Sequence, residues 1–198
     1  MRELAVDELQ LAEANFQDGI YRLRTGRPAG ALPLFEASAC AHTALPTVGH
    51  WRTCNLAGAQ LEATGEAQLP PALLEEMRDS GDQTLFAQAS LLAAALTAQD
   101  GEPFAHLVRQ AVDTAREIGI PIDGLVRAFA AVAVRANEPR SAALLLGRET
   151  DIHLFASSGS VHRLVRAHSA TTSSTASSMK GHTTDDEIIA LALTLGAP

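Results

Sequence analysis

Apolar residues recur at intervals of three and four along most of this chain, which is the spacing of one face of an α-helix. Near the N-terminus, Phe16, Ile20 and Leu23 form such a stripe within a helix predicted over residues 4–25. A second helix is predicted from Pro28 onward, with Phe35 on its apolar face. Further helices are predicted over residues 48–63, 71–80, 83–98, 103–118, 121–136 and 139–146.

Short turn signals separate these predicted helices. They are Thr64-Gly65, Gly81-Asp82, Asp100-Gly101, Gly119 and Asn137. Thr47 is a candidate N-cap for the third helix, and Pro33 is expected within the first turns of the second, where its missing N–H costs little. β-branched residues form no alternating run of the kind that a sheet needs. The chain is therefore predicted to be all-α, either an antiparallel bundle or a solenoid of stacked helical hairpins.

The sequence predicts that the chain divides into three parts, of which the last two differ from the helical domain. Residues 1–156 are predicted to form the helical domain, and residues 157–181 a partly flexible segment in which eight of the ten residues 169–178 are Ser or Thr. Residues 182–198 are predicted to form a capping helix that starts after Gly181, with Thr183 or Thr184 as its cap. This helix could fold back on its own chain or exchange onto a second copy, so self-association is left open.

The first two predicted helices resemble a tetratricopeptide repeat. Gly19, Ala31 and Phe35 fall at the offsets of the small, small and aromatic residues of that pattern, and Ser38 stands where a small residue is expected. The chain departs from the pattern at three positions, which are Asn15 in place of Trp, Arg22 in place of Tyr and Thr43 in place of the closing Pro. The resemblance implies stacked helical hairpins that bind other proteins.

A wider resemblance covers about residues 5–195. The stretch Ala142–Gly147 and the closing stretch Gly181–Leu193 are similar to the C-terminal repeats of large actinobacterial ATPase-type regulators, which carry LuxR-type or adenylate-cyclase domains. Ser178 departs from the aromatic residue usual there. The resemblance implies a part of, or a partner to, a signalling or transcription regulator. No glycine-rich loop precedes Lys180, the only lysine, so the chain lacks a P-loop, and no basic recognition helix is evident.

Charge and composition narrow the function further. The formal net charge of −8 argues against a nucleic-acid-binding surface, because phosphate contacts need clustered positive charge. The N-terminal residues run directly into an amphipathic acidic pattern rather than a signal peptide, and the apolar stretch 87–98 is too short to cross a bilayer. A cytoplasmic protein is expected, with Cys40 and Cys54 reduced unless neighbouring helices bring them together.

No residue pattern predicts catalysis, a metal or a cofactor. The histidines, among them His42, His50, His162 and His168, show no helical ligand spacing. The acidic neighbours Glu75-Glu76 and Asp185-Asp186 cannot converge on one substrate atom from the same helix face. The run Ser157–Ser160 lacks the strand and the Gly-x-Ser-x-Gly elbow of a hydrolase. The chain is therefore predicted not to be an enzyme.

Aromatic and arginine residues are the usual anchors of protein interfaces. Tyr21, Arg22 and Arg24 in the first helix, and Trp51 with Arg52 in the third, are the candidate partner-binding surface. A core position for Trp51 is the alternative. An acidic chain favours a protein or peptide partner of basic character.

Two other functions remain open. A pocket between helices could bind a small-molecule inducer, with Asn55, Gln60, Gln88 and Ser90 as the candidate polar lining. The chain could also be a degenerate fragment of a larger regulator.

Overall fold

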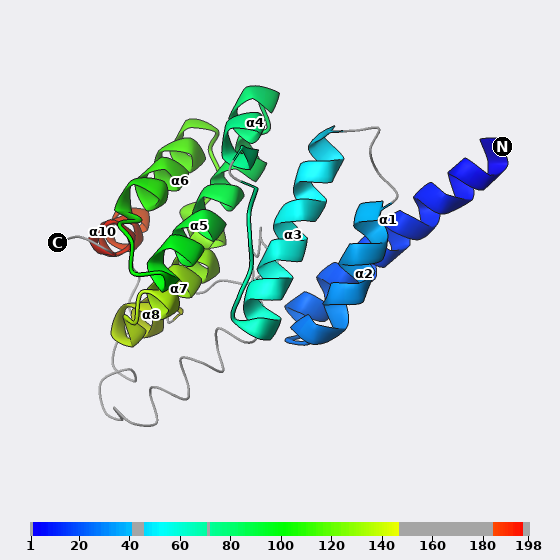
Figure 1. Cartoon of the computed structure of the whole chain (residues 1–198). Helices are drawn as coiled ribbons and strands as arrows, with labels where there is room; N and C mark the ends of the chain where they lie inside the picture. The colour runs from blue at the N-terminus through cyan, green and yellow to red at the C-terminus, as the bar shows by residue number, and fades with distance from the viewer. Residues whose placement is uncertain (1, 41–45, 71, 147–183, 196–198) are drawn as a thin grey trace.

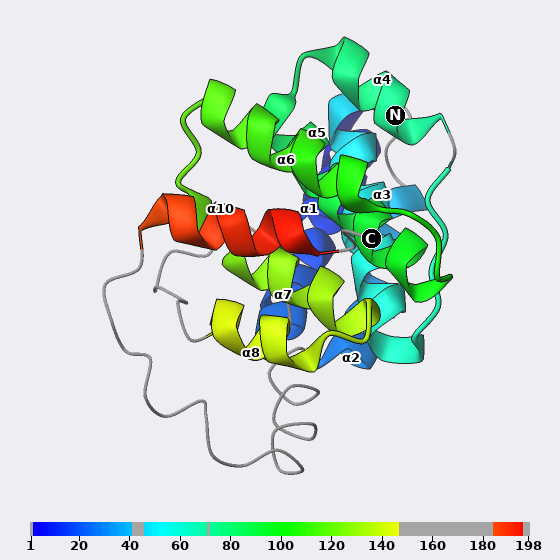
Figure 2. The same ribbon diagram turned by 90° about the vertical axis from the view of Figure 1, so that its left-hand side faces the viewer.

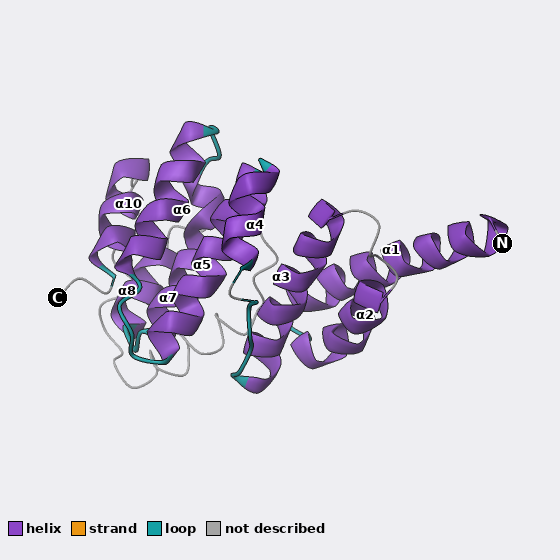
Figure 3. Ribbon diagram, turned by 45° about the horizontal axis from the view of Figure 1, so that its top comes forward, coloured by secondary structure: helices purple, strands orange, loops and turns teal. Residues whose placement is uncertain are grey.

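The computed structural model describes residues 2–40, 46–70, 72–146 and 184–195. Over these ranges it contains nine α-helices and one 3₁₀ helix. Figure 3 shows no strand in this part of the chain. The predicted all-α class is confirmed. The helices are α1 (Arg2–Arg24), α2 (Pro28–Cys40), α3 (Pro46–Thr64), α4 (Leu73–Ser80), α5 (Gln83–Gln99), α6 (Ala105–Glu117), η1 (Ile122–Leu125), α7 (Val126–Arg135), α8 (Pro139–Leu146) and α10 (Asp185–Thr194).

Most of these helices end where the turn signals predicted. Gly26, Gly101 and Gly119 have positive φ, and Asn137 is the one described non-glycine residue that does. At each of them, the N–H of the following residue bonds to the carbonyl five residues before it, as in Arg27 N to Arg22 O at 2.8 Å. Because the chain turns at a residue in the left-handed conformation, the next N–H group can donate to a carbonyl near the helix end that would otherwise have no donor. The chain therefore turns back after each helix within a few residues.

The helices pack as successive pairs. α1 packs on α2, α5 on α6, and α7 on α8, while the short α4 lies against α3 and α5. The first helices of the pairs also touch in order, because α1 contacts α3, α3 contacts α5, and α5 contacts α7 (Figure 1). The result is a row of helices in which α5 holds a central position.

The last helix lies against the far end of this row. α10 contacts α6, η1 and α8. In Figure 2 it runs across the molecule with α6 above it and with α7 and α8 below it. Its cap is the one expected at Thr184, where the Thr184 side chain accepts the Glu187 N–H and the Thr184 N–H donates to Glu187 Oε2 at 3.0 Å. The predicted Ser/Thr-rich segment 157–181 lies outside the described residues.

Three buried apolar clusters hold the row together. The largest joins α5, α6, η1, α7, α8 and α10. A second, between α3, α4 and α5, contains Cys54, Met77 and Phe86. The third, between α1, α2 and α3, is built around Phe35, which is fully buried. There a Cβ on Gly19 would lie 2.7 Å from Phe35 Cε1, so only glycine lets this ring approach α1 so closely.

Three local predictions were wrong. α3 begins at Pro46, so Thr47 lies inside the helix and is not its N-cap. Pro33 is the sixth residue of α2, past the first turn, and therefore removes the donor that Ala29 O would have in a regular helix. The single helix predicted over residues 121–136 is a 3₁₀ turn followed by α7. Gly124 in that turn weakens helix formation and favours the tighter winding.

Candidate functional site

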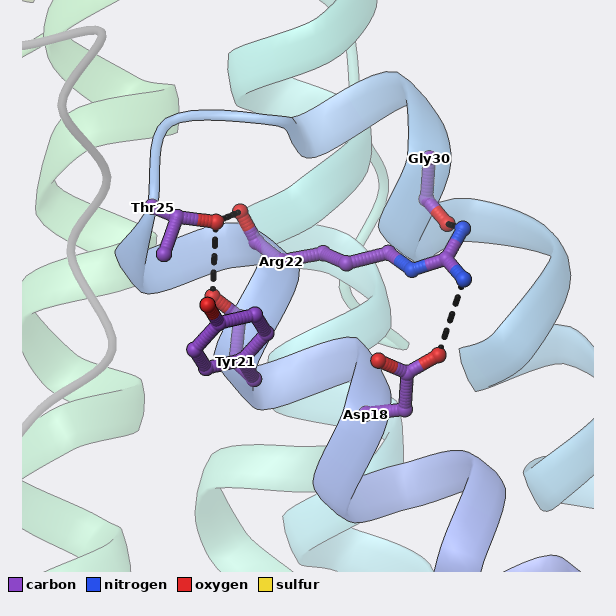
Figure 4. A network of polar contacts seen from close by, with 5 residues as sticks. All are labelled: Asp18, Tyr21, Arg22, Thr25 and Gly30. Atoms are coloured by element: carbon purple, nitrogen blue, oxygen red, sulfur yellow. Dashed lines mark hydrogen bonds and ion pairs between the residues drawn. The ribbon is translucent and has the colours of Figure 1, made fainter.

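The residues predicted to bind a partner through the end of α1 have different environments. Tyr21 is 63% exposed, and Arg24 is also exposed. Arg22 is held in place instead, because its guanidinium pairs with Asp18 Oδ2 at 2.9 Å and donates to Gly30 O at 3.2 Å (Figure 4). Arg22 therefore ties the end of α1 to the start of α2.

Arg52 is not on the surface, so the exposed position predicted for it is wrong. Its residue is 1% exposed, between α1, α2 and α3. Nη1 donates to Ser38 O at 2.8 Å, Nη2 lies 3.3 Å from Glu13 Oε2, and the guanidinium stands 5.6 Å from the centre of the Phe16 ring. A buried guanidinium needs such partners to offset its loss of water. Arg52 therefore joins three helices and cannot serve as an exposed anchor.

Trp51 has the core position that was the alternative to a surface role. It is half-buried and packs against the cluster formed by α3, α4 and α5. Within that cluster Cys54 is a buried free thiol. Burial raises the pKa of the Cys54 thiol to about 12, because the thiolate would lose its water.

The polar residues proposed to line an inducer pocket are mostly occupied elsewhere. Asn55 Nδ2 donates to Trp51 O at 2.8 Å, and Ser90 Oγ donates to Phe86 O at 2.8 Å, so both side chains bond within their own helices. The Gln88 Oε1 atom is buried without a hydrogen-bond partner. Gln60 lines an open cleft.

This cleft lies where the ends of α3 and α5 meet α2, and it has a volume of about 760 Å³. We call it the α3–α5 cleft. Its described lining residues are Leu32, Glu36, Gln60, Thr64, Glu66, Ala67, Gln68, Leu96, Gln99 and Asp100. A smaller depression of about 320 Å³, which shares Gln60 and Gln68, continues from it along α3 toward Thr53.

The α3–α5 cleft is acidic. Glu36 from α2, Glu66 from the loop after α3 and Asp100 at the end of α5 supply three exposed carboxylates. None of the described residues lining the cleft is basic. Leu32 and Leu96 add apolar surface. Such a cleft can accept a cationic head group while apolar contacts hold its aliphatic stem.

A hydrogen-bond network borders the cleft at Gln99. Gln99 Nε2 donates to Gly65 O at 2.6 Å, and Gln99 Oε1 accepts from Arg135 Nη1 at 3.0 Å. Arg135 Nη2 donates to Leu61 O at 2.8 Å. Burial lowers the pKa of Arg135, and the charge of Glu62 opposes that shift. These bonds tie α3, α5 and α7 together beside the cleft, so its walls are held in place.

This cleft could not be predicted from the sequence, because its carboxylates come from three segments that lie thirty or more residues apart at each step. The net charge of −8 predicts an acidic surface, but it does not indicate where on the molecule the carboxylates gather. Among the described residues, no three His, Cys, Asp or Glu side chains come together as metal ligands. No helix in the described part of the chain has the length and apolar character needed to cross a membrane.

Comparisons with known proteins add no relative to this picture. No protein-family model, no curated protein and no solved structure matches the chain.

Proposed function

We propose that this chain is a non-catalytic helical-repeat module that binds a basic segment of another protein in its α3–α5 cleft. The observation that carries the proposal is the cleft with its three carboxylates and no basic residue among its described lining. Opposite charge on a partner would speed the encounter and select against acidic competitors.

The repeat architecture is proposed from the packing order. The contacts between α1, α3, α5 and α7, each followed by a second helix, are those expected of stacked hairpins of the tetratricopeptide kind. The first pair also supports it, since Phe35 fills the space that Gly19 and Ala31 leave open. In such an array the row of first helices offers a surface to extended segments of partner proteins.

The partner chemistry follows from the cleft lining. A lysine or arginine head group would lie among Glu36, Glu66 and Asp100, and its methylene stem would run along Leu32 and Leu96. The side-chain amides of the lining glutamines can bond to the peptide backbone of the bound segment. The segment would therefore be basic and extended.

The cellular role is proposed from the resemblance to actinobacterial regulators. On that basis the module acts in the cytoplasm, as part of or partner to a signalling or transcription regulator. Binding of a small-molecule inducer is the weaker alternative, because Asn55 and Ser90 already satisfy carbonyls of their own helices.

A peptide-binding assay tests the proposal. The full chain is screened against arrayed peptides of varied charge, and affinities of the best binders are measured by fluorescence anisotropy. We expect basic peptides to bind, and Glu36→Gln/Glu66→Gln/Asp100→Asn to weaken binding about tenfold, since each exposed pair contributes roughly 0.2–1 kcal/mol. Added salt should weaken wild-type binding as well.

The matched control is Glu75→Gln/Asp79→Asn/Asp113→Asn, which removes three exposed carboxylates outside the cleft lining. This variant has the same net charge as the cleft variant and should bind like wild type. Equal losses in both variants would mean that net charge alone attracts the peptides. A failure of every basic peptide to bind would contradict the proposal. With a binding peptide in hand, capture from native cytosol using wild type and the cleft variant in parallel would identify the protein that carries such a segment.

A further inference from the structure

The chain runs back along α3 after that helix ends, as Figure 1 shows. Exposure alternates along this returning segment, residues 66–70, because Ala67 and Leu69 are half-buried and the three residues around them are exposed. This period of two is that of an extended chain. The backbone N–H and C=O groups of residues 67–69 make no hydrogen bond to any described residue. They are therefore free to bond an extended segment that lies beside them.

The returning segment also lines the smaller depression of about 320 Å³ that continues from the α3–α5 cleft. Leu69 and Pro70 of this segment and Leu56 and Ala57 of α3 give the depression its apolar surface. The hydroxyl of Thr53 already donates to a carbonyl of its own helix. None of the described residues that line the depression is charged. The depression therefore favours an apolar side chain, in contrast to the acidic cleft beside it.

The depression lies about two peptide residues from the cleft. Along the returning segment, residues 66–68 line the cleft and residues 68–70 line the depression, so their centres are about 7 Å apart in an extended chain. Along α3, Gln60 and Thr64 line the cleft, whereas positions from Thr53 to Gln60 line the depression. A rise of about 1.5 Å per residue puts these centres about 8 Å apart. Side chains two residues apart in an extended segment share one face and span nearly this distance.

We propose that the depression is a second subsite for the segment bound in the α3–α5 cleft, and that it takes an apolar side chain two residues from the basic one. The inference rests on the proposed function and adds a sequence rule to it. The bound segment has the pattern basic, any residue, apolar, in one of the two chain directions. Its backbone lies beside residues 67–69. An apolar residue at another spacing would point away from the depression or lie beyond it.

A series of synthetic peptides tests the spacing with the full wild-type chain. Each peptide carries one lysine in a glycine and serine background, with one leucine placed one to four residues before or after it. The peptide with serine in place of leucine is the reference. Affinities are measured by NMR titration, which also detects weak binding. We expect the affinity to peak at one position two residues from the lysine, about fivefold above the reference, because leucine leaves water there.

A substitution in the depression assigns this gain to the proposed subsite. Thr53→Trp fills the depression from α3 and should remove the difference in affinity between the leucine and serine peptides. Gln10→Trp adds the same ring at an exposed position of α1 outside both linings, so it should keep that difference. Circular dichroism checks that both variants remain helical.

The outcomes distinguish this inference from the proposed function. The second subsite alone would be overturned if lysine peptides lose binding in Glu36→Gln/Glu66→Gln/Asp100→Asn but gain nothing from leucine at any position. Equal gains from leucine at every position, or a gain that survives in Thr53→Trp, would overturn it as well. If no lysine peptide binds, the proposed function and the second subsite both fail.

Discussion

Between α1, α2 and α3 a charged side chain, Arg52, is buried together with Ser38, Asn55 and Phe35, whereas the buried polar side chains described from α5 to α10 are the uncharged Ser90 and Thr114. The two regions also achieve close helix contact differently. In the C-terminal region several buried residues are alanines, such as Ala111 and Ala133, which let neighbouring helices approach along their length. In the N-terminal region, where Ala12, Ala31, Ala57 and Ala59 are also buried, the Phe35 ring in addition packs directly against Gly19.

This difference has a consequence for stability and for binding. A large apolar cluster gains free energy from each buried side chain, while a buried guanidinium must first replace its lost hydration. The N-terminal helices should therefore open at lower free energy than α5–α8. The α3–α5 cleft lies at the boundary, so its carboxylates come from the more easily opened α2 and the firmly packed α5.

The largest effect is expected from Phe129→Ala in the C-terminal cluster. Phe129 is fully buried, so its loss leaves a cavity and should lower the free energy of unfolding by about 3–5 kcal/mol. Phe16→Ala is the counterpart in the N-terminal region. Phe16 is half-buried and stacks at a tilt 5.8 Å from Phe35, and its loss should cost clearly less. Urea unfolding measures both, and equal losses would contradict the contrast between the regions.

The next largest effect is expected from Arg52→Ala. It should lower the free energy of unfolding by about 3 kcal/mol, because it removes the packing of the side chain and its bonds to Ser38 and Glu13. Arg52→Met keeps much of the volume and removes the buried charge, so it should recover most of that loss. The same unfolding assay compares them. If methionine were as costly as alanine, the hydrogen bonds rather than the packing would hold this region together.

The stability of the protein should depend on pH through Cys54, which lies in the cluster between α3, α4 and α5. The pKa of Cys54 is raised, so the folded state keeps the thiol proton while the unfolded state releases it above pH 9. The free energy of unfolding should therefore have its full value at neutral pH and fall by about 1.4 kcal/mol between pH 8 and pH 10. The Cys54→Ala variant lacks this thiol. The difference between the pH dependence of wild type and that of the variant therefore isolates the contribution of Cys54. Parallel losses in wild type and variant would show that Cys54 is hydrated when folded.

The smallest effects come from a pair of helical glycines. Gly19→Ala places a Cβ 2.7 Å from Phe35 Cε1 and should destabilise by about 1 kcal/mol, since overpacking outweighs the gain in helix propensity. Gly58→Ala meets nothing within 4 Å, so it should stabilise by about 0.5–1 kcal/mol. Thermal unfolding separates the two variants, and a stabilising Gly19→Ala would mean that the Phe35 ring moves freely.

The sequence predicted what depends on neighbours along the chain. The stops at Gly119 and Asn137 and the cap at Thr184 follow from residues within a few positions of each helix end. The burial of Arg52 could not be predicted in this way, because its partners Glu13 and Ser38 lie on other helices. The α3–α5 cleft was missed for the same reason, as packing alone brings its three carboxylates together.

Hydrogen exchange with and without the tightest basic peptide from the array tests the central proposal most directly. We predict slower exchange at the C-terminal ends of α3 and α5 and in residues 65–70, with little change in α6 and α8. The Glu36→Gln/Glu66→Gln/Asp100→Asn variant should lose this protection under the same conditions. Protection confined to another surface, or identical protection in the variant, would contradict the assignment of the α3–α5 cleft as the binding site.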